Sequence, residues 1–341
     1  MSTRDRALTA TTATGEHVVR ELHQAMMEPA EEPSFEEELE AVWGESWGAH
    51  DEVGRLRRVL VRPPGAELEQ IRGDAYDERA DALVDPAGGW YWTGREPPDL
   101  ERVAVQHVGL VSTLRDEGVE VTVADSLGGR FVKSMYVRDP VLTVPGGAVV
   151  ARMAVRMRRG EEPAITRFVA ELGMPILGTI TGTGTVEGGS FVKLRPGLAA
   201  FGVSIRCNRS GAMQLQEIMT RIGWRLVLVP IPGYSIHLDG HLAMVDRRKA
   251  LVDVSHLSYE FLLMLRAEGF ELIAAHGGED WALNALCLRP GRVLMSADAP
   301  RTAQALEREG IEVVTIEYDE IHKNGGGVHC STIELVRETA D

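Results

Sequence analysis

Cys330 lies in a setting that favours nucleophilic chemistry, directly after the glycine-rich stretch 324–329. Backbone N–H groups exposed in such a turn lower the pKa of a thiol, and the missing side chains let a substrate approach the main chain. Cys287 lies in an apolar run typical of a buried strand, where cysteine behaves as a small inert hydrophobe. Cys207 lies beside Arg206, but no glycine turn presents it. We therefore predict that Cys330 is the nucleophile.

His237 and Asp239 are the candidate base and its neighbouring acid. If this segment is a strand, its alternation places both side chains on one face, so they share one pocket. A base beside a carboxylate can exchange protons with a nucleophile and its substrate. A metal site formed by His237, Asp239 and His241 is an alternative, but the spacing matches no zinc signature and Gly240 interrupts any helix.

Two more acidic residues lie at predicted turns. Glu187 precedes a Gly-Gly pair, and Asp139 precedes Pro140 at the predicted end of a strand. A planar guanidinium carries five N–H donors in a fixed fork, and two or three carboxylates around it satisfy those donors. The acids therefore favour a small-molecule guanidinium substrate. A turn-capping role for Glu187 and a surface salt bridge for Arg138 are the structural alternatives.

The composition excludes several classes of partner. The chain has 341 residues, with 51 acidic against 36 basic side chains and a formal net charge of -15. Such a surface repels phosphate backbones and anionic membranes, so we expect no nucleic acid and no membrane partner. Three widely spaced cysteines indicate a reducing compartment, and no apolar stretch approaches about 18 residues. We expect a cytoplasmic protein and leave open whether it forms a homo-oligomer.

The elements that must position these groups are short strands alternating with helices. Amphipathic stretches at 100–117, 162–172, 213–222 and 302–309 each end at a glycine and lead into an apolar strand. The recurrence predicts an α/β domain of similar units, although an ordinary doubly wound sheet fits the spacing equally well. Residues 1–45 are polar and acidic, so we predict a partly disordered or helical arm before a catalytic domain at 46–341.

Taken in order, these motifs resemble the guanidine-modifying enzymes: arginine deiminases, dimethylarginine dimethylaminohydrolases and amidinotransferases. The likeness covers about residues 49–337 and runs through HDEVGRLRRVLVRPPG, YVRDP, GGAVVARMAVRMRRGEE, EGG, FGVSIR, HLD, ALNALCLRPGRVL and GGGVHC. It implies a five-bladed α/β propeller (pentein) of repeated ββαβ modules, with the active site in the central channel.

The resemblance also implies a role for each candidate. Cys330 would attack the guanidinium carbon, and His237 would protonate the departing amine before activating water. The guanidinium would be held by three carboxylates, those of Asp139, Glu187 and Asp239. No metal and no organic cofactor is expected.

At the other end of the substrate, the resemblance places Arg158 and Arg206 where deiminases hold the α-carboxylate. Three positions depart from the deiminase pattern. Ser190 stands in place of an aspartate and Lys133 in place of a substrate-binding asparagine. An arginine that precedes the cysteine in deiminases is replaced by Asn324 or Gly325. Lys133 and Asn324 are therefore further substrate-binding candidates, and the substrate is expected to differ from plain arginine at its amino-acid end.

We predict a cysteine-dependent hydrolase that acts on arginine or an arginine-like compound through a covalent S-alkylthiouronium intermediate. An amidinotransferase, in which an amine acceptor replaces water, is the alternative. It is favoured by the stretch MAVRMR and by a segment between Arg62 and Asp139 too short for the helical insertion of arginine deiminases. A guanidine-binding protein without catalysis is a third possibility.

Overall fold

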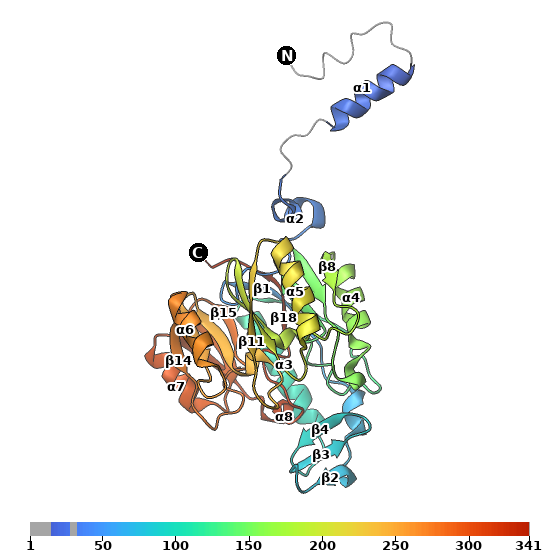
Figure 1. Cartoon of the computed structure of the whole chain (residues 1–341). Coiled ribbons are helices and arrows are strands. Elements are labelled where there is room, and N and C mark those ends of the chain that lie inside the picture. The colour runs from blue at the N-terminus through green and yellow to red at the C-terminus, as the bar shows by residue number, and fades with distance from the viewer. Residues whose placement is uncertain (1–14, 28–32, 341) are drawn as a thin grey trace. The chain divides into compact units, whose positions relative to one another are not determined.

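A computed structural model describes residues 15–27 and 33–340 (Figure 1). Contacts divide the chain after Glu38, seven residues before the boundary predicted from the sequence. Helix α1 (Gly15–Met27) belongs to the first unit, and α2 (Phe35–Trp43) spans the division. The remainder of the predicted arm, residues 1–14 and 28–32, lies outside the described residues.

Five three-stranded sheets in the second unit share one design. In each, two antiparallel strands are followed by a helix and a third strand that pairs in parallel with the second. Four of these units are continuous in sequence: β6 (Val141–Val144), β7 (Gly147–Val150), α4 (Glu161–Glu171) and β8 (Ile176–Thr179); β9 (Phe191–Arg195), β10 (Leu198–Val203), α5 (Arg209–Arg221) and β11 (Arg225–Pro230); β12 (Leu242–Asp246), β13 (Lys249–Val252), α6 (Tyr259–Ala267) and β14 (Glu271–Ala274); β15 (Leu286–Arg289), β16 (Arg292–Ser296), α7 (Pro300–Arg308) and β17 (Glu312–Ile316).

The fifth sheet joins segments near the two ends of the compact unit 39–341. Strand β18 (Ile333–Arg337) pairs antiparallel with β1 (Leu56–Val61), which pairs in parallel with β5 (Glu120–Val123) after helix α3 (Leu100–Asp116). The strand that follows Cys330 is therefore held by the first strand of the domain. The α/β class predicted from the sequence is confirmed.

The recurring glycine marks the end of a helix in each predicted case. Gly118, Gly173, Gly223 and Gly310 have φ values of 77°, 96°, 77° and 78°, in the left-handed region that residues with a Cβ avoid. At the other ends, Asp99 and Asn208 cap α3 and α5 by accepting a hydrogen bond from a backbone N–H. The predicted helices are thus confirmed to within a few residues.

The strands are apolar because the sheets are buried. Every residue of β6 and β7 is buried, and the same holds for three of the four residues of β15. Cys287 lies in β15 and is buried, as its apolar context predicts. The loops that carry the polar candidates therefore follow or precede buried apolar strands.

Two local predictions are wrong. Asp139 lies in a turn that precedes strand β6, not at the end of a strand, because Pro140 lacks the N–H that a ladder position needs. His237 is extended, with φ −135° and ψ 153°, but it has no strand partner and leads into the 3₁₀ helix η6 (Leu238–Gly240). The strand alternation proposed for His237 and Asp239 therefore does not exist.

A sixth, small sheet lies between β1 and α3 and projects from the five units (Figure 1). It contains Trp92, which is fully buried, and Tyr91, which reaches the cavity described below. Within the part of the chain that the structure describes, no helix has the length and apolar character needed to cross a bilayer. The small sheet and the remaining short helices are η2 (Ala66–Gln70), η3 (Gly73–Ala75), β2 (Tyr76–Asp77), β3 (Ala82–Asp85), β4 (Trp90–Thr93), η4 (Arg156–Arg158), η5 (Gly188–Ser190) and α8 (Asp319–His322).

Candidate active site

Most of the candidate residues line one cavity of about 380 Å³. The loops that line it come before β6, after β7, after β10, after β11, before β15 and before β18. Segments almost 200 residues apart in sequence therefore meet at one place. Seven predicted residues line the cavity: Lys133, Asp139, Arg158, Arg206, His237, Asp239 and Cys330.

Cys330 lies in a turn and is bracketed by the side chain of Asn284. The Asn284 Nδ2 donates a hydrogen bond to the Cys330 Sγ over 3.0 Å, and the Cys330 N–H donates to the Asn284 Oδ1 over 3.1 Å. A Cβ at Gly327 would lie 2.7 Å from that Oδ1, so the glycine-rich turn allows this close approach. The Cys330 Sγ also lies 3.7 Å from Asp239 Oδ2.

The electrostatic setting of Cys330 differs from the prediction. Burial raises the pKa of its thiol well above the usual range, and the charges of Asp239 and Asp139 raise it further. Hydrogen bonds from the turn and from Asn284 lower the pKa, but they do not offset burial. This setting favours the neutral thiol of Cys330 over the thiolate. Cys207 and Cys287 are also buried, which raises the pKa of each to about 12, and neither lines this cavity.

His237 is held between two carboxylates. Its Nε2 lies 2.7 Å from Glu187 Oε2, and its Nδ1 lies 3.5 Å from Asp139 Oδ1. A Cβ at Gly189 would lie 2.6 Å from that Nδ1. The position therefore requires glycine, the second of the two that follow Glu187. Burial alone would lower the pKa of His237, but the Asp139 charge and the hydrogen bond to Glu187 raise it above its usual value. His237 is thus poised as a proton donor.

The same two acids also bind arginines. Arg206 contacts Glu187 twice, with Nη2 at 2.6 Å from Oε2 and Nε at 3.0 Å from Oε1. Arg158 contacts Asp139 and forms a two-point pair with Glu161, over 2.9 and 2.7 Å. Burial raises the pKa of Asp139 and Glu187, but the neighbouring cations outweigh it and lower both. Both acids are therefore charged, and the role of the arginines toward a substrate carboxylate stays a prediction.

Asp239 has a different partner, which the sequence analysis did not single out. His329 Nδ1 lies 2.9 Å from Asp239 Oδ2, and burial, which lowers the pKa of His329, is outweighed by the nearby carboxylates of Asp239 and Glu52. The metal site considered from the sequence is not formed by its three residues, because His237 is bound to Glu187 and Asp239 to His329. The sequence held one signal for a role of His329, namely that it directly precedes Cys330.

Lys133 and Asn324 form a pair at the edge of the cavity. The Lys133 ammonium donates to the Asn324 backbone oxygen and lies 4.0 Å from the centroid of the Tyr91 ring. Burial and the charges of Arg158 and Arg206 lower the pKa of Lys133 to about 7. Asn324 itself is fully buried and does not line the cavity. Asn324 therefore orients Lys133, and its predicted contact with substrate has no support in this geometry.

This clustering of a thiol, a charged imidazole and three carboxylates can be compared with known proteins. The family profile described as "N,N dimethylarginine dimethylhydrolase, eukaryotic" matches residues 96–337. The chain belongs to this family. It is therefore a guanidine-modifying enzyme of the pentein superfamily, as the motifs indicated.

The chain is similar to known proteins both in sequence and in structure. The N(G),N(G)-dimethylarginine dimethylaminohydrolase of Pseudomonas aeruginosa is 28% identical over 238 residues, which is 70% of this chain and 90% of the relative. A solved structure of that organism's enzyme, a mutant complexed with citrulline, has a TM-score of 0.67 at 25% identity and covers 82% of this chain and 100% of its own. An amidinotransferase from Microseira wollei has a TM-score of 0.69 at 19% identity, with 87% and 98% coverage, and shows the shared fold.

Proposed function

We propose that the protein is a cysteine-dependent hydrolase that removes ammonia or an amine from the guanidinium group of arginine or an arginine-like compound. The observation that carries the proposal is the arrangement of Cys330 and His237 in one cavity around the carboxylates of Asp139 and Asp239. A nucleophile, a proton donor and anionic partners for a guanidinium are thereby within reach of one small ligand.

A bound guanidinium would change the state of Cys330. The carboxylates that raise the thiol pKa, Asp239 and Asp139, are also the groups that would bind the ligand. A cation between them offsets their charge and stabilises a thiolate, so the substrate itself lowers the pKa of its nucleophile. The Asn284 amide, 3.0 Å from Sγ, supplies a hydrogen bond to that thiolate.

The steps follow from these positions. The Cys330 thiolate adds to the guanidinium carbon and forms a C–S bond, while the carboxylates keep the group cationic and electrophilic. The tetrahedral adduct loses ammonia or an amine as His237 donates a proton to the leaving nitrogen. Neutral His237 then takes a proton from water, whose oxygen attacks the S-alkylthiouronium carbon. The C–S bond breaks, the thiol is regenerated and a urea-type product leaves.

The family match and the P. aeruginosa relative favour hydrolysis, with arginine or a methylated arginine as the substrate class. An amidinotransferase is the second candidate, because the segment that contains Arg158 resembles that branch. In that case an amine would attack the intermediate in place of water. Lys133 and the two arginines of the cavity are the groups available to an acidic end of the substrate.

The proposal includes the closed, five-bladed arrangement of the units. Neighbouring units are in contact through β18 and β6, β9 and β12, β12 and β15, and β15 and β1. The remaining pair, the β6–β8 and β9–β11 units, share one apolar cluster that includes Leu142 and Phe201. These contacts support a ring around the cavity. They also support residues 46–341 as the catalytic domain.

Product analysis tests the reaction. The purified protein is incubated with arginine, monomethylarginine or dimethylarginine, each with and without glycine or ornithine, and the products are identified by mass spectrometry. We expect a ureido product and release of ammonia or a methylamine without an acceptor, and none of these with Cys330→Ser. A product that forms only with an acceptor would identify a transferase, and no consumption of any guanidine would contradict the proposal.

A further inference from the structure

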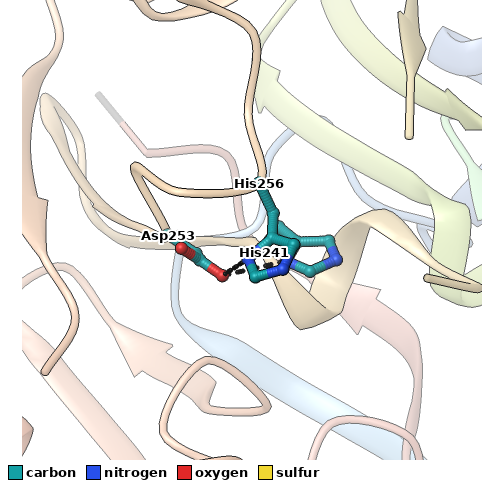
Figure 2. Close-up of side chains that lie close together, drawn as sticks. All are labelled: His241, Asp253 and His256. Carbon is teal, nitrogen blue, oxygen red and sulfur yellow. Dashed lines mark hydrogen bonds and ion pairs between the residues drawn. The ribbon is translucent and has the colours of Figure 1, made fainter. Parts of the chain in front are cut away.

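A second cluster of potential ligands lies at the rim of the cavity. Asp253 Oδ2 is 3.3 Å from His241 Nδ1 and 2.6 Å from His256 Nδ1. The two imidazole rings stack with their centroids 5.0 Å apart and 22° between their planes. Figure 2 shows the carboxylate directed at both rings. All three donor atoms lie within 4.8 Å of one another, and His241 also lines the cavity.

The donor set is the one preferred by zinc and similar ions. Two imidazole nitrogens and one carboxylate oxygen bind a borderline ion and leave a coordination position open. In a tetrahedral site with bonds of about 2.0 Å, donor atoms lie about 3.3 Å apart. The His241–Asp253 separation already has that value, and the ring of His256 must move back from the carboxylate to admit an ion.

The ligands are also accessible. The side chain of His256 is 51% exposed, which gives an ion a path from solvent. His241 is buried and lines the cavity, so the cluster extends from solvent to the cavity wall.

Another group of potential ligands, Asp139, Glu187 and His237, is less suited to a cation. It is fully buried, and its carboxylates already bind Arg158 and Arg206. A divalent ion there would lie beside two guanidinium groups. The rim cluster has no such neighbour among its described ion pairs, so the two groups differ in charge balance as well as in access.

The rim cluster is connected to the catalytic loop. His241 ends the η6 helix, with its N–H donating to the Leu238 oxygen over 2.8 Å, and the Asp253 N–H donates to the His241 oxygen over 2.9 Å. His237 and Asp239 lie within four residues of His241. We propose that His241, Asp253 and His256 form a binding site for one zinc-class ion, which ties the loop carrying His237 and Asp239 to the segment after β13. The chemistry proposed above does not use this ion.

Direct titration tests the site without any substrate. The chain is freed of metal with a chelator, and zinc chloride is titrated by calorimetry, with magnesium chloride as a hard-ion control that prefers oxygen ligands. We expect one zinc per chain and no magnesium. His256→Ala should weaken zinc binding at least about 10-fold, since loss of even outer partners of a ligand costs about 10–100-fold. The matched control is His276→Ala, an exposed histidine outside the cluster, which should bind zinc like the unaltered protein.

Each further outcome decides the proposal. Absence of zinc binding, or binding that survives in His256→Ala and is lost in Cys330→Ser, overturns it, the latter because the ion would then bind the nucleophile. Melting temperatures without zinc show that each variant folds, and His256→Gln replaces the alanine variant if it does not. Hydrogen exchange of residues 235–241 should slow with zinc in the unaltered protein and in His276→Ala, but not in His256→Ala. Binding without that protection would overturn the link to the loop.

Discussion

The two sides of the cavity hold their charges differently. On the His237 side, both carboxylates bind an arginine and the imidazole at once. On the Cys330 side, Asp239 is bound by the imidazole of His329 and lies 3.7 Å from a neutral thiol. The first side is therefore a completed ion network. On the second side, His329 is the one partner of Asp239 among the described ion pairs, and a guanidinium placed beside the thiol would be a second cationic partner.

This difference suggests how the site distinguishes its ligand. The pKa of His237 is raised and the pKa of Cys330 is raised, so both groups hold their protons more tightly than free side chains do. A neutral ligand would leave the thiol protonated and unreactive. Under the proposed function, a cation placed against Asp239 favours the thiolate, so that substrate binding and activation of the nucleophile are coupled.

The largest expected effect is the loss of the nucleophile. Cys330→Ser should reduce turnover by about 10⁴-fold or more, because a serine hydroxyl is far less ionised and less nucleophilic than a thiol. Steady-state rates measure this. The matched controls are Cys207→Ser and Cys287→Ser, whose thiols are buried away from the cavity and should retain the chemistry if folded. If turnover were lost only in Cys207→Ser, the nucleophile would be Cys207 and the assignment of Cys330 would be wrong.

A smaller effect is expected on the Cys330 side when its hydrogen-bond partner is removed. Asn284→Ala deletes the amide that contacts Sγ, and a hydrogen bond to a charged group contributes about 1.5–3 kcal/mol. We expect turnover to fall about 10–100-fold, since 1.36 kcal/mol corresponds to a factor of ten. In the same variant, the pH profile for the rate of alkylation by iodoacetamide should shift to higher pH. An unchanged alkylation profile would mean that the amide does not stabilise the thiolate.

The smallest effect concerns the pH dependence of the free enzyme. Because burial and two carboxylates raise the pKa of Cys330, its thiolate fraction grows only above the usual range for cysteine. Alkylation of Cys330 should therefore be slow at neutral pH and rise with pH beyond the profile of a free thiol. An alkylation rate that is already maximal at neutral pH would show that Cys330 is a thiolate in the free enzyme. The proposed contrast between the His237 side and the Cys330 side would then be wrong.

Local patterns in the sequence were sufficient for the repeating elements. Each helix end is marked by a glycine that must adopt positive φ, as at Gly118 and Gly223, and a buried strand follows. The pairing of β18 with β1 could not be found this way, because it joins residues almost 280 positions apart and depends on the packing of the whole domain.

The same limit applies to the site. The motif types indicated Cys330, His237 and the acids, but Asn284 contacts Cys330 across 46 residues and no local pattern marks it. The predicted shift in the pKa of the Cys330 thiol had the wrong direction. The glycine-rich turn was visible in the sequence, whereas burial and the approach of Asp239 were not. Long-range proximity, not residue type, was the missing information.

The most direct test of the account is a search for the covalent intermediate in His237→Gly. The variant lacks the group that activates water, while Cys330 and the carboxylates that bind the guanidinium are intact, so an adduct should accumulate. Denaturing mass spectrometry after incubation with substrate should show added mass, mapped by digestion to the peptide that contains Cys330. A hydrolase adduct keeps the carbon chain of the substrate, whereas an amidinotransferase adduct is a bare amidino group. An adduct on Cys207 or on a carboxylate would contradict the account.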